Sequence, residues 1–299
     1  MKVSILMNGY NCQKYVKEAI DSVIAQTYEN WELVFINNCS TDQTLEIVES
    51  YDNEKIKCIS TSENIPLGAA REVGLKYCDG DYVCFLDTDD LWLSNKLEKQ
   101  LEMFKKDIDL KMVYTGVYFI NGSGKCIGKY TPSAGGDIFR RQLVRYEINQ
   151  QSVMIRNDFD FSFDQNKKYS VDYCLFMSIC AKYKVGVLES KLVKYRMHDS
   201  NLSHSVNELE WIEQKDTLDN VFQNNLDLEH MYPKEYQLAY ARVFYYKARY
   251  LMSVNEASNA RVELKKYYKT NLFYCSLYLL SLFPVSLWSF LHKKIRRFS

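Results

Sequence analysis

The chain is poor in the residues that break regular structure. It contains 4 prolines and 11 glycines among 299 residues, and no stretch is of low complexity, which excludes long disordered segments. Neither charge sign is in excess, because Lys plus Arg and Asp plus Glu each number 38. A general nucleic-acid-binding protein would carry a basic excess. The length allows one large domain or two modest ones.

The sequence also lacks paired cysteines. None of its nine cysteines forms a C-x-x-C pair, which argues against a zinc ribbon or a redox motif. Cys84, Cys174 and Cys180 lie within apolar runs, where cysteine acts as a small core residue. The N-terminus leads directly into an apolar strand and shows no long signal-peptide core. We therefore expect reduced thiols and a cytoplasmic protein.

The first 87 residues alternate between apolar strands and amphipathic helices. Strands are expected at residues 2–7, 31–36, 55–60 and 81–87, and helices at 13–27, after 40–41 and at 66–78. This rhythm predicts a parallel sheet with right-handed crossovers. Polar turns follow the strands at 8–11, 37–42 and 87–90. In open α/β sheets ligands bind at that edge, so we expect the functional site there.

Beyond residue 94 the pattern becomes mixed and then helical. An exposed helix is expected at 95–106, a hairpin around the NGSG at 121–124, helices at 136–146 and 171–183, and strands at 151–156, 184–189 and 192–198. From about residue 206 the chain reads as helical, with a helix pair over 240–268 that resembles one tetratricopeptide-type hairpin. We therefore expect a domain at 1–205 and a helical region at 206–299.

Residues 272–291 carry no charge and are flanked by cations. Lys265, Lys266 and Lys269 precede them, and HKKIRR follows. Twenty residues are enough to span a bilayer, but four serines, two tyrosines and Pro284 interrupt the stretch. Three alternatives stay open: a membrane span, an interfacial helix pair and a core helix packed on the preceding hairpin. We favour the interfacial pair, within a candidate membrane-associating segment at 272–297.

Three carboxylates follow the expected fourth strand, in the stretch FLDTDDLW. Asp87, Asp89 and Asp90 offer oxygen ligands that suit Mg²⁺ or Mn²⁺, with phosphate oxygens and water completing the shell. A structural alternative makes Asp90 the N-cap of a helix through residues 91–93. An EF-hand loop is disfavoured, because Leu91 and Trp92 stand where further oxygen ligands are needed.

Polar and aromatic residues of the neighbouring turns are candidates for nucleotide contacts. Tyr10 follows the first strand and could stack on a flat base, or be an ordinary half-buried aromatic among 24 tyrosines. The amides of Asn37 and Asn38 can donate and accept, which suits a uracil-like edge as well as a plain turn. Arg71, on the helix that begins at Pro66, is either a partner for a phosphate or carboxylate or a surface residue.

Taken together, these motifs resemble a family 2 glycosyltransferase of the bacterial surface-polysaccharide type. The resemblance rests on VSILMNGYNCQKYVKEAIDSVIAQTYENWELVFINNCSTD, NIPLGAAREVGLKYCDGDYVCFLDTDDLW, VDYCLF and YRMHDSNLS, in that order over residues 1 to about 205. It implies an α/β GT-A fold, Rossmann-like, with a mostly parallel sheet and helices on both faces, followed by the C-terminal helical region.

The resemblance also implies an activity. A sugar would pass from a nucleoside-diphosphate sugar, with UDP the expected carrier, to an acceptor hydroxyl with inversion. The setting would be the synthesis of a bacterial cell-surface glycan, lipopolysaccharide or capsule. The implied partners are the donor, a glycan or lipid-linked acceptor and a membrane surface, but no nucleic acid. The implied location is cytoplasmic, peripheral on the inner face of the cytoplasmic membrane.

Site roles follow from the same resemblance. Tyr10 and the turn at Asn37 and Asn38 would bracket the base, and Arg71 would approach the nucleotide. The D-x-D function, which holds ribose and a Mn²⁺ or Mg²⁺ ion, would fall to Asp87, Asp89 and Asp90. Asp172 would be the general base, and His198 would lie near the metal and the diphosphate.

Structural alternatives stand beside the last two roles. A helix N-terminus favours an acidic residue such as Asp172 through its dipole and free amides alone. A neutral imidazole can ligate a metal, but His198 could equally be a solvated histidine.

The chain departs from the family pattern at several positions. The family commonly has two acidic residues where this chain has Asn37 and Asn38, a Glu where it has Val171, and an Asn where it has Glu72. An asparagine can accept a hydrogen bond from a uracil imide, but without a charge. These departures leave an inactive nucleotide-sugar-binding or membrane-scaffold protein as one alternative.

A nucleotidyltransferase of similar topology is the second alternative. It would release pyrophosphate, and it usually carries a Gly-rich basic turn after the first strand, where this chain has MNGYNCQKY. On the acceptor side, Gln150 and Gln151 are expected on a strand after a flexible loop at 132–136, and we predict that they face the acceptor.

Overall fold

The computed structural model describes residues 1–198, 201 and 206–295, with side chains as far as Leu291. The chain separates into two compact units. The first comprises Met1–Ile138 and Glu147–Asn201, and the second comprises Phe139–Tyr146 and Leu202–Ser299. The expected division between residues 205 and 206 stays a prediction, because 202–205 lie outside the described residues. The same holds for the tail of the YRMHDSNLS motif and for the last two residues of the segment 272–297.

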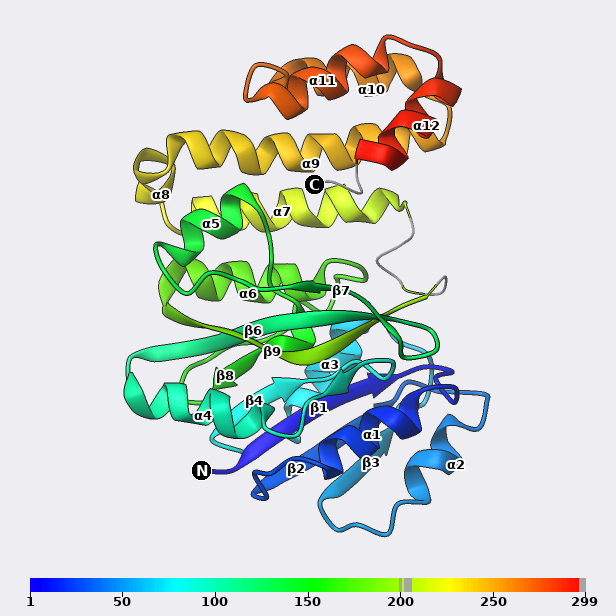
Figure 1. Cartoon of the computed structure of the whole chain (residues 1–299), viewed down its shortest axis with the longest axis vertical. Helices are drawn as coiled ribbons and strands as arrows, with labels where there is room; N and C mark the ends of the chain where they lie inside the picture. The colour runs from blue at the N-terminus through cyan, green and yellow to red at the C-terminus, as the bar shows by residue number, and fades with distance from the viewer. Residues whose placement is uncertain (199–200, 202–205, 296–299) are drawn as a thin grey trace. The chain divides into compact units, whose positions relative to one another are not determined.

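The first unit is built on one mixed sheet. Its strands are β1 (Val3–Gly9), β2 (Trp31–Asn37), β3 (Ile56–Ser60), β4 (Tyr82–Phe85), β5 (Leu91–Trp92), β6 (Leu110–Asn121), β7 (Cys126–Tyr130), β8 (Met154–Arg156) and β9 (Lys184–Met197). Within the described part of the chain they run in the order β3-β2-β1-β4-β8-β6-β9-β5, and β7 pairs with β6 (Figure 1).

The parallel half of the sheet confirms the alternation read from the first 87 residues. β1 pairs in parallel with β2 and β4, and β2 with β3. Gly9 lies opposite Asn37, and Leu6 lies opposite Phe85, so these strands end at one edge. Beyond β4 the sheet is mixed, because β8 runs antiparallel to both β4 and β6. The hairpin expected around residues 121–124 is confirmed as β6 and β7.

Helices cover both faces of this sheet, as expected for the fold. One face packs against α1 (Val16–Ile24), α2 (Thr44–Glu49) and α4 (Lys96–Lys106), and the other against α3 (Leu67–Leu75) and α6 (Val171–Lys182). Strand side chains alternate between faces, so Ile5 and Phe35 join the first cluster. Phe85 packs on Phe176 of α6 on the second face, with ring centroids 6.1 Å apart. Burying each such side chain contributes about 1.5–3 kcal/mol.

The strand expected at residues 151–156 is partly wrong. Residues Gln150–Ser152 form a 3-10 turn, η1, and the strand begins at Met154. The amides of Ser152 and Val153 bond back to the carbonyl oxygens of Asn149 and Gln150, at 2.9 and 3.0 Å. The Ser152 hydroxyl also donates to the Asn149 oxygen. These local bonds compete with strand pairing, so the apolar pattern alone misplaces the element.

The second unit is helical. It contains most of α5 (Ile138–Val144), followed by α7 (Glu208–Gln223), α8 (Asp227–Met231), α9 (Pro233–Ser253), α10 (Ala257–Tyr267), α11 (Leu272–Ser281) and α12 (Val285–Ile295). The expected helix pair is confirmed as α9 and α10, which turn at 254–256. The uncharged stretch breaks into α11 and α12, because Pro284 lacks the N–H that a continuous helix needs. No described helix is both long and apolar enough to cross a bilayer.

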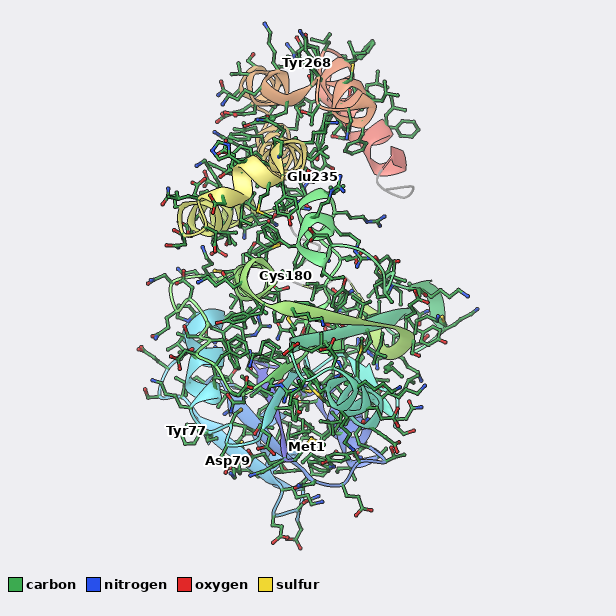
Figure 2. All side chains as sticks on the ribbon, turned by 90° about the vertical axis from the view of Figure 1, so that its left-hand side faces the viewer. Met1, Tyr77, Asp79, Cys180, Glu235 and Tyr268 are labelled. Carbon is green, nitrogen blue, oxygen red and sulfur yellow. The ribbon has the colours of Figure 1, made fainter. Side chains whose placement is uncertain are left out.

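A saturated ionic cluster occupies the sheet edge where the parallel strands begin. Lys2 contacts Asp79 there, and Figure 2 labels Met1 and Asp79 in this part of the unit. The buried carboxylate of Glu32 accepts hydrogen bonds from Lys2, Lys57 and Ser4. Although burial raises the pKa of Glu32, these donors outweigh it and hold the pKa below its usual range. At the other edge, by contrast, Oδ2 of Asp90 is buried with no hydrogen-bond partner among the described residues.

Candidate functional site

Charged side chains from several segments gather where the parallel strands end. The loop after β4 carries Asp87, Asp89 and Asp90, α3 carries Arg71, and the first turn of α6 carries Asp172. The backbone is tightly packed at this edge. A Cβ on Gly9, the last residue of β1, would lie 2.6 Å from Cys12 Sγ and 3.1 Å from Thr88 Cγ2. The acidic loop therefore lies directly against the end of β1.

Arg71 and Asp87 form the inner part of the site. The Arg71 guanidinium is buried, with Nη2 at 3.4 Å from Asp87 Oδ1 and Nε at 3.4 Å from Asn8 Oδ1. Desolvation raises the pKa of Asp87 to about 6; Arg71 opposes this shift, and the charges of Asp89 and Asp172 add to it. The charge of Asp172 thus acts on the loop after β4, and its role as general base stays a prediction.

His198 lies beside Asp89. Its Nε2 is 2.9 Å from Asp89 Oδ2, and the Asn201 side-chain amide lies 3.4 Å from the same oxygen. The Tyr15 ring stacks on the imidazole, with centroids 5.4 Å apart. The predicted neighbourhood of the histidine and the D-x-D carboxylates is therefore present in the fold.

Asp90 differs from its neighbours because it is buried. Its side chain is 1 % exposed, and Oδ1 accepts a hydrogen bond of 2.6 Å from the Arg196 amide. Oδ2 is buried and has no hydrogen-bond partner among the described residues. Burial and the charges of Asp89 and Asp87 raise the pKa of Asp90 well above its usual value. The helix-cap alternative for Asp90 is wrong, since the two-residue strand β5 follows it.

Arg196 is a positioning residue that the sequence reasoning missed. Its guanidinium is fully buried and donates to the backbone oxygen of Asp89 at 2.8 Å and to Glu18 at 2.7 Å. It also lies 4.4 Å from the centroid of the Tyr15 ring that stacks on His198. The available signal was strand alternation, which puts positions 196 and 198 on one side of the strand expected at 192–198. Arg196 thus holds the backbone of the acidic loop, residues 87–90, in place.

Asn37 and Asn38 are buried, and their amides already serve the protein. Asn37 donates to the Ser60 hydroxyl and accepts from the Ser40 amide, both at 3.1 Å. Asn38 donates to the Ile65 oxygen at 2.8 Å and accepts from the Ile65 amide at 3.0 Å. The two side chains hold the turn after β2 together, and their contact with a base stays a prediction.

The remaining predicted residues differ in accessibility. Tyr10 is exposed at the end of β1, where a planar ligand can reach its ring. Gln150 and Gln151 lie on η1 and are buried, which corrects their expected place on a strand. The backbone oxygen of Gln151 accepts a hydrogen bond of 2.9 Å from Trp92 Nε1. Its side-chain nitrogen has no hydrogen-bond partner within the described residues.

The arrangement fits a cation that draws part of its shell from a ligand. Residues 1–198, 201 and 206–295 contain no group of three or more His, Cys, Asp and Glu placed to hold a metal alone. Asp89 and His198 nevertheless supply an oxygen and an imidazole at one point. Mg²⁺ sites commonly use one or two protein carboxylates and take the remaining ligands from phosphate and water. The unpaired Oδ2 of Asp90 agrees with a missing cationic partner.

Comparison with known proteins decides the family. The glycosyl transferase family 2 model matches residues 4–167, which is more than half of the chain. The chain belongs to glycosyltransferase family 2. It is therefore a glycosyltransferase, and the α/β GT-A fold predicted from the motifs is confirmed.

Two relatives are bacterial glycosyltransferases. One is the UDP-Glc:alpha-D-GlcNAc-diphosphoundecaprenol beta-1,3-glucosyltransferase WfgD of Escherichia coli, 31% identical over 207 residues that cover 67% of this chain and 79% of the relative. Another is the putative teichuronic acid biosynthesis glycosyltransferase TuaG of Bacillus subtilis, 28% identical over 205 residues that cover 67% and 81%.

The fold is also found in a solved structure. The crystal structure of Staphylococcus aureus TarS 1-349 in complex with UDP-GlcNAc matches with a TM-score of 0.59 and 18% identity, over 88% of each chain. This glycosyltransferase thus shares its architecture, a mixed sheet with helices and a helical C-terminal region, with that protein.

Proposed function

We propose that this glycosyltransferase moves a sugar from a nucleoside-diphosphate sugar, with UDP as the carrier, to an acceptor hydroxyl with inversion. One arrangement carries the proposal: Asp87 and Asp89 follow β4 where the parallel strands end, His198 lies 2.9 Å from Asp89, and the charge of Asp172 on α6 adds to the desolvation that raises the pKa of Asp87. A carboxylate for the acceptor and carboxylates for the donor therefore share one edge of the sheet. The UDP-Glc in the name of the Escherichia coli relative supports the choice of carrier.

Asp172 is proposed as the general base. The acceptor oxygen would bond to the anomeric carbon while the bond from that carbon to the diphosphate oxygen breaks. The acceptor proton would pass to the Asp172 carboxylate, and the nucleoside diphosphate would leave with the bonding electron pair. A single displacement with one base forms no covalent glycosyl-enzyme, so it inverts the configuration.

The donor would bind across the ends of β1, β2 and β4. We propose that the nucleotide base stacks on the exposed ring of Tyr10, over the turn that Asn37 and Asn38 hold together. Arg71 would meet the nucleotide from α3, since its guanidinium already lies 3.4 Å from the Asp87 carboxylate. Asp87 would then contact the ribose.

We propose Mn²⁺ or Mg²⁺ as the cofactor, with Asp89 and His198 as its protein ligands. When bound, the ion neutralises the negative charge that develops on the leaving diphosphate. Asp90 was predicted as a further ligand, and its unpaired Oδ2 supports a place beside the ion. Arg196 keeps Asp89 and Asp90 in place through the backbone oxygen of one and the carboxylate of the other.

We propose a glycan or lipid-linked acceptor, used in the synthesis of a bacterial surface glycan such as lipopolysaccharide or capsule. Gln150 and Gln151 remain the candidates on the acceptor side. The side-chain nitrogen of Gln151, which has no hydrogen-bond partner among the described residues, supports this, because a buried donor of this kind is a group that a ligand can satisfy. The diphosphoundecaprenol in the name of the Escherichia coli relative supports a lipid-linked acceptor. We propose on this basis that the protein works in peripheral association with the inner face of the cytoplasmic membrane.

A panel of nucleotide sugars tests the proposal. We expect the wild-type protein with Mn²⁺ to release UDP from one UDP-sugar, and Asp89→Ala to lose this release. Asp52→Asn, at an exposed site remote from the loop after β4, serves as the matched control and should match the wild type. Release of pyrophosphate would instead identify a nucleotidyltransferase. No release from any donor, with the protein folded, would point to an inactive binding protein.

A further inference from the structure

We propose that the outer sides of α11 and α12 form a docking surface for an anionic phospholipid bilayer. We define this apolar face by the large hydrophobic residues that it exposes: Leu272, Leu279, Leu282, Phe283, Leu287 and Phe290. The inference deepens the peripheral association proposed above, but it rests on the second unit alone and needs no knowledge of the reaction.

The two sides of α11 differ sharply in exposure. Tyr274, Leu277 and Leu280 face the core of the second unit and are buried. Leu272 and Leu279 are seven residues apart, which places them on the other side of the helix. Leu272 is 89% exposed, and Leu279 is exposed as well. The helix is therefore apolar on both sides, although packing within the chain needs only one.

The exposed row continues through the turn and into α12. Leu282 and Phe283 lie in the turn between the helices and are exposed. In α12, Trp288 packs into the core at 2 % exposure, whereas Phe290 is 59% exposed. A run of exposed large hydrophobic residues over two consecutive helices is unusual for a surface that meets only water.

The distribution of charged residues along the chain favours a lipid with an anionic headgroup. Seven of the 38 basic residues, and none of the 38 acidic ones, lie in residues 264–299, although the whole chain has zero net charge. Lys265 and Lys269 are exposed at the end of α10, next to the Tyr268 labelled in Figure 2. Lys293, Lys294 and two arginines follow in the sequence. Apolar side chains flanked by cations bind interfaces that carry anionic lipid.

The same charge pattern argues against a second copy of this chain as the occupant. A symmetric contact through the apolar face would bring together two copies of a segment, residues 264–299, that holds seven basic residues and no acidic one. Lys266 pairs with Glu263, but Lys265 and Lys269 are exposed. Like charges that meet across an interface oppose association. An anionic bilayer offers the complementary charge and an apolar interior at once.

Vesicle flotation with the full-length chain tests the proposal. We expect the wild-type protein to float with vesicles of phosphatidylglycerol and phosphatidylcholine, much less with phosphatidylcholine alone, and less again in ~1 M NaCl, where surface charges are screened. Leu279→Ser with Phe283→Ser should lower the bound fraction on anionic vesicles by about tenfold or more. Lys265→Gln with Lys269→Gln should lower it by about tenfold, but only at low salt.

Matched variants separate this surface from general effects. Leu226→Ser with Met231→Ser removes two exposed apolar residues from the same unit, and should float like the wild type. Lys105→Gln with Lys106→Gln removes two exposed lysines from α4, and should also float like the wild type.

Three results would overturn the proposal. One is that the wild-type protein floats with neither vesicle type. Another is that the Leu279→Ser, Phe283→Ser variant floats with anionic vesicles as well as the wild type does. A third is a concentration-dependent dimer that only this variant loses, which would identify a second copy as the occupant. UDP release without vesicles should be unchanged in all four variants, so a failure here is distinguishable from a failure of the proposed reaction.

Discussion

Nε2 of His198 lies 2.9 Å from Oδ2 of Asp89, although 109 residues separate the two positions in the sequence. The pairing of β5 with β9 produces this proximity, since Leu91 lies opposite Lys194. The short strand thus ties the acidic loop to the end of β9. The two residues that we propose as metal ligands are therefore brought together by strand register rather than by a local motif.

We predict that His198→Ala weakens Mn²⁺ binding in the presence of UDP by roughly tenfold or more, because it removes the only imidazole beside Asp89 in the described residues. The resonance of free Mn²⁺ in electron paramagnetic resonance measures this binding without turnover. His230→Ala, at an exposed position in α8, is the matched control and should bind like the wild type. Equal affinity in both variants would remove His198 from the proposed metal site.

Arg196 should matter for stability far more than its partner Glu18. Arg196→Met removes the side-chain donors to the Asp89 backbone oxygen and to Glu18, while the amide of residue 196 still bonds Asp90, so we expect a loss of about 1–3 kcal/mol in the free energy of unfolding. Glu18→Gln should cost less than about 1 kcal/mol, because the Glu18 side chain is 55% exposed. Urea unfolding measures both. Losses of similar size would show that the ion pair between Arg196 and Glu18 carries the stabilisation, and not the buried hydrogen bond from Arg196 to the Asp89 backbone oxygen.

Elements whose pattern is local were predicted well from the sequence. β1 to β4, the helices between them and the β6–β7 hairpin each follow from the spacing of apolar residues and from the turns that bound them. The candidate site residues of the polar turns were placed well for the same reason, because they lie at strand ends. Asp172 was placed on the first turn of a helix and occurs there.

Features that depend on distant contacts were missed. Glu18 and Arg196 form an ion pair although 178 positions separate them, and the sequence around either residue does not indicate the other. Gln150 and Gln151, expected on a strand, instead form a 3-10 turn that local hydrogen bonds hold. For Asn37 and Asn38 the sequence left both a base contact and a plain turn open, and only the structure shows that both amides bond within the turn. Each of these outcomes depends on where a second chain segment lies, which spacing along the chain does not encode.

Lys96 shows the same limit and allows a prediction about pH. Its helix was expected to be exposed, yet Lys96 is fully buried, with Nζ 2.7 Å from Gln100 Oε1 and 3.9 Å from the centroid of the Trp92 ring. Burial lowers the pKa of Lys96 from 10.5 to about 8. Between these values the unfolded chain binds more protons than the folded one, so the contribution of Lys96 to stability rises with pH.

The expected result is a difference in pH dependence. From about pH 7 to about pH 10, the wild type should gain roughly 2–3 kcal/mol in unfolding free energy relative to Lys96→Met. Chemical denaturation at the two pH values measures this. Lys99→Met, on the same helix and half-buried, should keep the pH dependence of the wild type. If the two methionine variants respond to pH alike, Lys96 is not the group that titrates.

The most direct test of the central claim is Asp172→Asn, measured for sugar transfer and for UDP binding in the same preparation. The variant keeps the size of the side chain but cannot accept the acceptor proton as a carboxylate does. We predict a fall in turnover of ~10²–10⁴-fold with UDP affinity close to that of the wild type. Turnover equal to that of the wild type would contradict the assignment of Asp172 as the base and, with it, the account of this edge of the sheet as the catalytic site.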